Sequence, residues 1–90
     1  DSPTVLAAQT ANELLDISGI KASFVLTVYE GKIYMSARSI DEVNVQIIAE
    51  KLGGGGHINS AGAQFDHTNI EEAVNALKET IDKMIEEGDI

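Results

Sequence analysis

The sequence contains no cysteine, no tryptophan and only one proline in its 90 residues. Without cysteine the chain has no thiolate nucleophile, no cysteine zinc site and no disulfide framework, a composition that fits a reducing cytosol. No window approaches the ~20 apolar residues of a membrane-spanning helix, and the N-terminus does not resemble a signal peptide. We expect one domain over residues 1–90, able to bury roughly 60 to 65% of its unfolded surface.

Positive charge is also scarce, because six Lys and Arg stand against fifteen Asp and Glu and give a net charge of −9. The electrostatic field of this net negative charge repels long nucleic acids, so nonspecific binding to a duplex is not expected. A small anionic ligand held by a few donors remains compatible, since much of the acidic excess lies between Glu71 and Asp89. Asp1 stands in place of an initiator methionine, which predicts that the chain was cut from a longer protein, although processing or tag removal would leave the same start.

Local patterns predict three helices and three strands. Ser2 and Pro3 are typical of a helix start, and apolar residues then recur at helical spacing until Ser18-Gly19. A β-rich hairpin follows over 22–29 and 32–38, with a turn at Glu30-Gly31. A second helix capped by Asp41 runs to Leu52, a third strand covers 61–65, and a last helix begins at a capping box of Thr68 and Glu71. This order predicts an α/β fold, a small mixed β-sheet with helices packed on it.

The run of four glycines from Gly53 to Gly56, followed by His57, is the most informative stretch. Glycine loses much backbone entropy on ordering, so a compact domain keeps such a run where something must approach the main chain. The amides of Gly54, Gly55 and Gly56 are therefore predicted to bind a phosphate, with His57 as a donor at the edge. A helix C-cap explains Gly53 alone, and a flexible linker would have polar flanks, which this run lacks.

Arg38, at the end of the predicted second strand, is the second candidate. A planar guanidinium can bind two phosphate oxygens at once. The alternative is an exposed charge that pairs with Asp41 or Glu42. Asn44 could contact either a ligand or the preceding loop. Residues 60–63 are all small, namely Ser60, Ala61, Gly62 and Ala63. Small side chains are expected both where a flat ligand covers a segment closely and where strands pack tightly, so both interpretations stay open.

The chain resembles the DHHA1 domain over nearly its whole length. The residues that carry the resemblance are Ser36-Ala37-Arg38-Ser39, Asn44-Val45, the GGGGH run and Ser60-Ala61-Gly62-Ala63. DHHA1 is the C-terminal substrate-binding half of DHH-family phosphoesterases. The sequence around the motif is most similar to that of the GdpP/YybT-type cyclic-di-AMP phosphodiesterases, including the segments Ile17–Val25 and Ile40–Gln46.

The resemblance implies a parent protein anchored in the bacterial plasma membrane, with this domain in the cytoplasm and making no direct membrane contact. It also implies a DHH domain that holds manganese and hydrolyses cyclic-di-AMP to pApA. By the same resemblance Arg38 and His57 hold phosphate, Gly54 to Gly56 offer backbone N–H groups, and Asn44 with Ser60 to Ala63 line the nucleotide pocket.

No metal-ligand spacing and no nucleophile–base arrangement is evident in the sequence, so we expect neither metal nor catalytic residues in this chain and no activity from it alone. The expected partners are a cyclic dinucleotide or short oligonucleotide, the DHH domain of the same parent chain, and a second copy in a homodimer. Two other interpretations stay open. The chain could belong to an oligoribonuclease/pAp phosphatase or RecJ-like single-strand nuclease, or it could be a non-catalytic interaction module.

Overall fold

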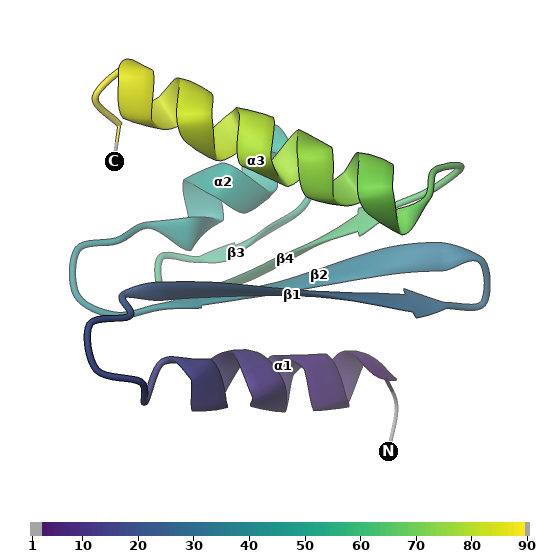
Figure 1. Cartoon of the computed structure of the whole chain (residues 1–90), viewed down its shortest axis with the longest axis horizontal. Coiled ribbons are helices and arrows are strands. Elements are labelled where there is room, and N and C mark those ends of the chain that lie inside the picture. Colours follow the sequence, from purple (N-terminus) through teal and green to yellow (C-terminus); the bar gives the residue numbers. More distant parts are fainter. Residues whose placement is uncertain (1–2, 90) are drawn as a thin grey trace.

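The computed structural model describes residues 3–89. Its elements in chain order are α1 (Pro3–Leu14), β1 (Ala22–Tyr29), β2 (Lys32–Ser39), α2 (Val45–Lys51), β3 (Gly55–His57), β4 (Ser60–Phe65) and α3 (Ile70–Glu86). The four strands form one sheet in the order β1-β2-β4-β3. Helix α1 lies against one face, and α2 and α3 lie against the other (Figure 1).

The predicted α/β class, with helices packed on a small sheet, is confirmed. One detail differs, because every strand pair within residues 3–89 is antiparallel, whereas a mixed sheet was expected. The fourth strand is β3, which the sequence did not predict. It pairs with β4 across a short hairpin, and antiparallel strands can be joined by such tight turns.

The β1–β2 hairpin sets the register of the sheet. Glu30 and Gly31 connect the strands, and both have positive φ values, 50° and 77°. Positive φ at both central positions is the mark of a type I′ hairpin turn, whose twist matches that of the flanking strands. The strands then pair without a bulge from Tyr29 with Lys32 to Ala22 with Ser39.

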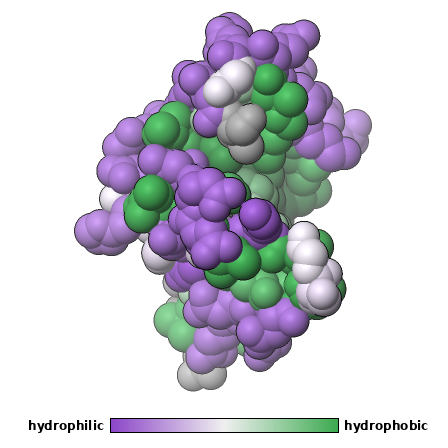
Figure 2. Space-filling model, turned by 90° about the vertical axis from the view of Figure 1, so that its left-hand side faces the viewer, coloured by the Kyte–Doolittle hydropathy of each residue, from purple (hydrophilic) through white to green (hydrophobic). Residues whose placement is uncertain are grey.

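The main hydrophobic core lies between the sheet and the α2–α3 layer. Alternate residues of β2 and β4 point into it, because successive strand residues face opposite sides. Its buried members are Met35, Ala37, Val45, Ile48, Ala49, Ala61, Ala63, Leu77 and Met84. Figure 2 shows hydrophobic atoms in a hollow beneath the hydrophilic outer surface of α3.

Helix α2 begins later than predicted. Its N-cap is Asn44, whose Oδ1 accepts from the backbone N–H groups of Gln46 at 2.9 Å and Ile47 at 3.3 Å. Asp41 instead lies in the preceding turn with a φ of 56°. An amide oxygen satisfies amides of the first turn that have no intrahelical partner, so the helix starts where that oxygen is placed.

Helix α3 is capped one residue later than the predicted capping box. Asn69 Oδ1 accepts from the N–H of Glu72 at 2.8 Å, while Thr68 Oγ1 donates to the Glu72 carboxylate at 2.6 Å. Of the apolar residues of α3, Leu77 and Met84 are in the core, whereas Ile70 and Ile85 are exposed.

The first helix ends at Leu14 and continues as turns to Gly19, where φ is 87°. Its predicted N-cap, Ser2, lies outside the described residues. Among residues 3–89, no helix combines the length and the apolar composition that crossing a membrane requires.

Candidate functional site

The glycine run is divided between the end of α2 and an edge strand. Gly53 has a φ of 89°, and its N–H donates to the carbonyl of Glu50 at 3.1 Å. The N–H of Gly54 donates to the carbonyl of Ala49 at 2.8 Å. These two bonds form a Schellman motif, which satisfies free carbonyls at a helix C-terminus. The Gly54 amide, predicted to bind phosphate, is therefore engaged within the fold.

Glycine is required at two positions of the run for packing against β4. A Cβ on Gly54 would collide with the carbonyl oxygen of Gly62, and one on Gly56 would lie 2.5 Å from the Cα of Ala61. Gly56 also has a φ of 144°, which other residues rarely adopt. Glycine in a strand marks a close approach of another backbone or of a ligand, and here the other backbone is β4.

Gly55 differs from its neighbours. A Cβ there would meet no other atom within 4 Å, and its φ is not positive. The fold therefore does not require glycine at this position. Because β3 is an edge strand, its backbone N–H groups alternate between β4 and the free edge, so either Gly55 or Gly56 directs its amide away from β4. The second half of the run is thus an extended edge strand where a loop was predicted, and anion binding by its amides stays a prediction.

Arg38 and His57 lie in one cross-strand row. Arg38 on β2 pairs with Ser60 on β4, and Ser60 pairs with His57 on β3. Directly paired residues of antiparallel strands point to the same face. With strands about 4.8 Å apart, the two Cα atoms are about 10 Å from one another. The structure thus brings Arg38, Ser60 and His57 to one face.

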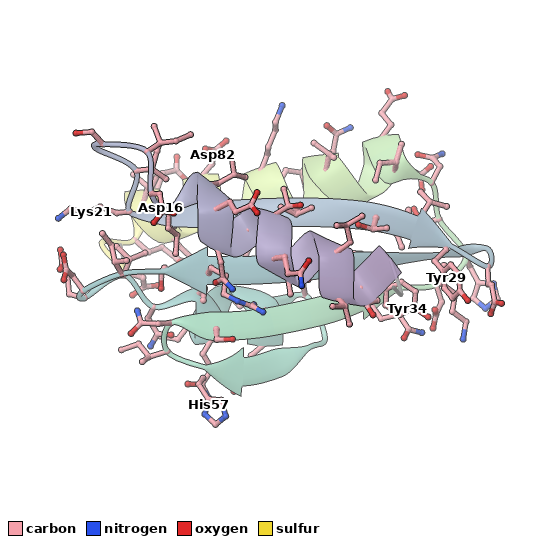
Figure 3. The ribbon with its side chains drawn as sticks, turned by 90° about the horizontal axis from the view of Figure 1, so that it is seen from below. Asp16, Lys21, Tyr29, Tyr34, His57 and Asp82 are labelled. Carbon is pink, nitrogen blue, oxygen red and sulfur yellow. The ribbon has the colours of Figure 1, made fainter. Side chains whose placement is uncertain are left out.

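This face is covered only in part. Helix α1 crosses β1 and β2, whereas β4 and β3 lie beside it in the view from below (Figure 3). At the covered end of the row, Ser23 is buried and its Oγ donates to the carbonyl of Ala11 at 2.7 Å. At the other end His57 is exposed at the free edge (Figure 3). The row is therefore closed by α1 on one side and open to solvent on the other.

The guanidinium of Arg38 has no acidic partner among the described residues, where the single ion pair joins Lys21 and Glu42 at 3.4 Å. Its Nη1 donates to the carbonyl of Ala37 at 2.8 Å. The alternative of a surface ion pair with Asp41 or Glu42 is therefore wrong for this conformation. Most of the five guanidinium N–H groups stay available for an anion on the open face.

Other predicted residues lie on the opposite side of the sheet. Ala61 and Ala63 are buried in the α2–α3 core, so their side chains do not line the face that carries Arg38. Asn44 caps α2 in the same layer as that core. Of the predicted 60–63 segment, only Ser60 and Gly62 face the same side as Arg38, because strand residues alternate.

Ser39, which flanks Arg38, makes its hydrogen bonds within the fold. It is buried, and its Oγ donates to the carbonyl of Val43 and accepts from Asn59 Nδ2 at 2.9 Å. Asn59 Nδ2 also lies 3.3 Å from the carbonyls of Asp41 and Val43. Asn59 therefore ties the β3–β4 hairpin to the loop before α2. The sequence analysis did not single out this residue.

Two further residues of the face, Tyr34 and Gln64, are not among the predicted site residues. They are direct partners across β2 and β4 and share the face of Arg38 and Ser60. Counting by twos from Arg38 along β2 and from Ser60 along β4 would have placed both residues on this face.

Among residues 3–89, no metal-ligand group lies on this face. Residues 3–89 contain no group of three or more His, Asp or Glu side chains that could hold a metal ion, and the manganese that the resemblance implies belongs to the DHH domain and not to this chain. A cavity of about 290 Å³ lies instead on the opposite layer, lined by Lys51, Thr80, Lys83, Met84 and Glu87. The candidate site is the part of the sheet face that α1 leaves open.

Residues 3–87 match the family model for the DHHA1 domain. The chain belongs to the DHHA1 family. The chain is 48% identical, over 93% of its length, to part of "Cyclic-di-AMP phosphodiesterase GdpP" of Geobacillus thermodenitrificans. "Cyclic-di-AMP phosphodiesterase PdeA" of Listeria monocytogenes is 48% identical over 88% of the chain. "Bifunctional oligoribonuclease and PAP phosphatase NrnA" of Thermus thermophilus is 35% identical over 72%.

The DHHA1 fold also matches a solved structure. A crystal structure of an exopolyphosphatase-related protein from Bacteroides fragilis superposes with a TM-score of 0.76 and 29% identity, over 82% of this chain and 22% of that one. The chain spans 13%, 12% and 20% of the lengths of the GdpP, PdeA and NrnA relatives. The chain therefore corresponds to one domain of each of these longer relatives.

Proposed function

We propose that this domain is the substrate-binding half of a cyclic-di-AMP phosphodiesterase and holds a substrate phosphate between Arg38 and His57. The observation that carries the proposal is the in-register row of Arg38, Ser60 and His57 on the uncovered part of the sheet. A guanidinium, a hydroxyl and an imidazole can together surround the oxygens of one phosphate.

The identity of the substrate is supported by the relatives. Identity is 48% to two proteins named as cyclic-di-AMP phosphodiesterases and 35% to the oligoribonuclease and PAP phosphatase. The net charge of −9 also disfavours long polyanions, because their binding depends on many cationic contacts. A dinucleotide needs few contacts, and the Arg38 row supplies a small number.

Bond cleavage is assigned in this proposal to the rest of the parent protein. A manganese-bearing DHH domain would face the open sheet and supply the reactive water, and a membrane anchor would lie elsewhere in that protein. The role of this chain is to bind and orient, which accelerates a reaction by fixing the geometry of the reacting groups.

A titration of the 90-residue chain with cyclic-di-AMP, pApA and a longer oligonucleotide tests the proposal. We expect calorimetric binding of the dinucleotides, with amide shifts in two-dimensional NMR around Arg38, Gly55 and His57. Arg38→Gln should weaken binding about 10- to 100-fold, since a charge-assisted hydrogen bond contributes about 1.5–3 kcal/mol. His57→Ala should weaken it as well.

Lys78→Gln is the matched control, because it removes the same charge from α3 on the other side of the sheet. Equal losses for Arg38→Gln and Lys78→Gln would show that only net charge matters and would refute the site. Affinity that rises steadily with oligonucleotide length would favour a nuclease, and self-association without any nucleotide response would favour an interaction module.

A further inference from the structure

The open face carries a second pair of polar side chains at a distance from the phosphate row. Tyr34 and Gln64 are paired across β2 and β4, and each lies four residues along its strand from Arg38 or Ser60. Four residues of strand span about 13 Å. Tyr34 and His57 accordingly lie well apart in the view from below (Figure 3).

The residues between these two rows do not obstruct the face. Ser36 and Gly62 form the intervening pair, so no long side chain projects there. A ligand whose phosphate lies at Arg38 can therefore extend along the sheet toward Gln64. The group attached to a nucleotide phosphate in that direction is its sugar and base.

The amide of Gln64 is oriented by its neighbour. Its Nε2 donates to Asp66 Oδ1 at 2.8 Å, and a carboxylate can only accept. This bond fixes which end of the amide faces Asp66, and it leaves Oε1 and the second N–H of Nε2 for a ligand. Gln64 itself is exposed on the strand. One acceptor beside one donor is the pattern with which glutamine recognises the amino group and ring nitrogen of adenine.

We infer that Gln64 is a specificity-determining residue that recognises the amino-bearing edge of the base whose phosphate lies at Arg38. This inference rests on the proposed function and deepens it by naming the recognised group. A base with a carbonyl in place of the amino group, such as hypoxanthine, would place two acceptors against one another. The amide could rotate to avoid this, but its oxygen would then face the Asp66 carboxylate. Asp66 is therefore the positioning residue, and discrimination depends on both side chains.

The test measures binding of AMP, IMP and ribose 5-phosphate to the 90-residue chain by calorimetry. We expect the wild type to prefer AMP over IMP about tenfold, because one good bidentate pair separates matched from mismatched bases by a factor of roughly 5 to 150. Gln64→Ala, and the strand-favouring variant Gln64→Thr, should bring the AMP to IMP ratio close to one and leave ribose 5-phosphate binding unchanged. Gln46→Ala on α2 is the matched control and should keep the ratio.

Asp66→Ala distinguishes a positioning role from a structural one. We expect this variant to lose most of the preference while total affinity for AMP falls little, because the freed amide can rotate to suit either base. An AMP to IMP ratio that survives in both Gln64 variants overturns the inference and leaves the proposed function standing. If the wild type binds none of the three phosphates, or if Arg38→Gln binds ribose 5-phosphate as well as the wild type does, the proposed function fails, and the inference fails with it.

Discussion

Arg38 and His57 are both cross-strand neighbours of Ser60, one on each side of β4. The relationship depends on a register that no single segment of the chain encodes. A shift of β3 by one residue would turn His57 to the core face and separate the two side chains. The packing that holds β3 in register is therefore as important for the site as the functional groups themselves.

Gly55 and Gly56 should respond in opposite ways to a methyl group. Gly56→Ala places a Cβ 2.5 Å from the Ala61 Cα at a φ of 144°, so we expect it to lower the free energy of unfolding by about 2–4 kcal/mol. Gly55→Ala meets no atom within 4 Å and should change it by less than about 0.5 kcal/mol. Urea unfolding followed by circular dichroism measures both values.

The same pair tests what Gly55 is for. If a ligand approaches the main chain of β3, Gly55→Ala should weaken dinucleotide binding although the domain remains as stable as the wild type. Unchanged affinity in this stable variant would contradict a ligand at β3. A stability loss for Gly55→Ala as large as that for Gly56→Ala would contradict the packing described for the strand.

Asn44 should act on stability through its cap. Removal of an N-cap side chain costs about 1 kcal/mol, so Asn44→Ala should lower the free energy of unfolding by roughly that amount. Asn44→Asp keeps an oxygen that can accept from the amides of Gln46 and Ile47 and should restore stability. Ligand affinity measured on the folded variants should stay unchanged, and a loss in Asn44→Asp alone would instead indicate a ligand contact.

Much of the fold could be predicted because its signals are local. Glu30-Gly31 specifies a hairpin turn, and the apolar spacing around Leu77 specifies a helix, without knowledge of distant segments. Strand β3 could not be predicted in this way, since glycines carry no alternating pattern. It forms because Gly54 and Gly56 allow its backbone close to β4, a contact between segments that sequence patterns do not show.

The candidate site divides along the same line. Arg38 and His57 were found from their chemistry, whereas the faces of Ala61, Ala63 and Gln64 depend on strand alternation once the register is known. Asn44 was left between a ligand contact and a contact with the preceding loop, and the cap of the second helix was assigned to Asp41. The hydrogen bonds of Asn44 to the first turn of α2 identify the capping role.

The Lys21–Glu42 ion pair should make a small, pH-dependent contribution. A hydrogen bond to the Glu42 carboxylate from its own backbone N–H, and then the nearby Lys21 charge, lower the pKa of Glu42. A carboxyl with a depressed pKa stabilises the fold above its ordinary titration range, and that contribution is lost as the pH falls through the depressed value. Glu42→Gln should therefore be slightly less stable than wild type at pH 7 and equal to it at pH 2–3. Thermal unfolding at the two pH values checks this, and a constant difference would contradict it.

Asn59 should be the most sensitive polar side chain of the loop region. Its Nδ2 donates to Ser39 Oγ at 2.9 Å and lies within 3.3 Å of two loop carbonyls, at Asp41 and Val43. Loss of this side chain removes a donor from the partly buried Ser39 Oγ and Val43 carbonyl, which costs about 1–3 kcal/mol. We expect Asn59→Ala to lower the free energy of unfolding by this amount. Amide hydrogen exchange should also speed up in 40–44 and 57–60 but not in α1, because the contact joins only the loop and the hairpin. Uniform acceleration across the domain would mean that Asn59 contributes to global stability alone and does not hold the hairpin in place.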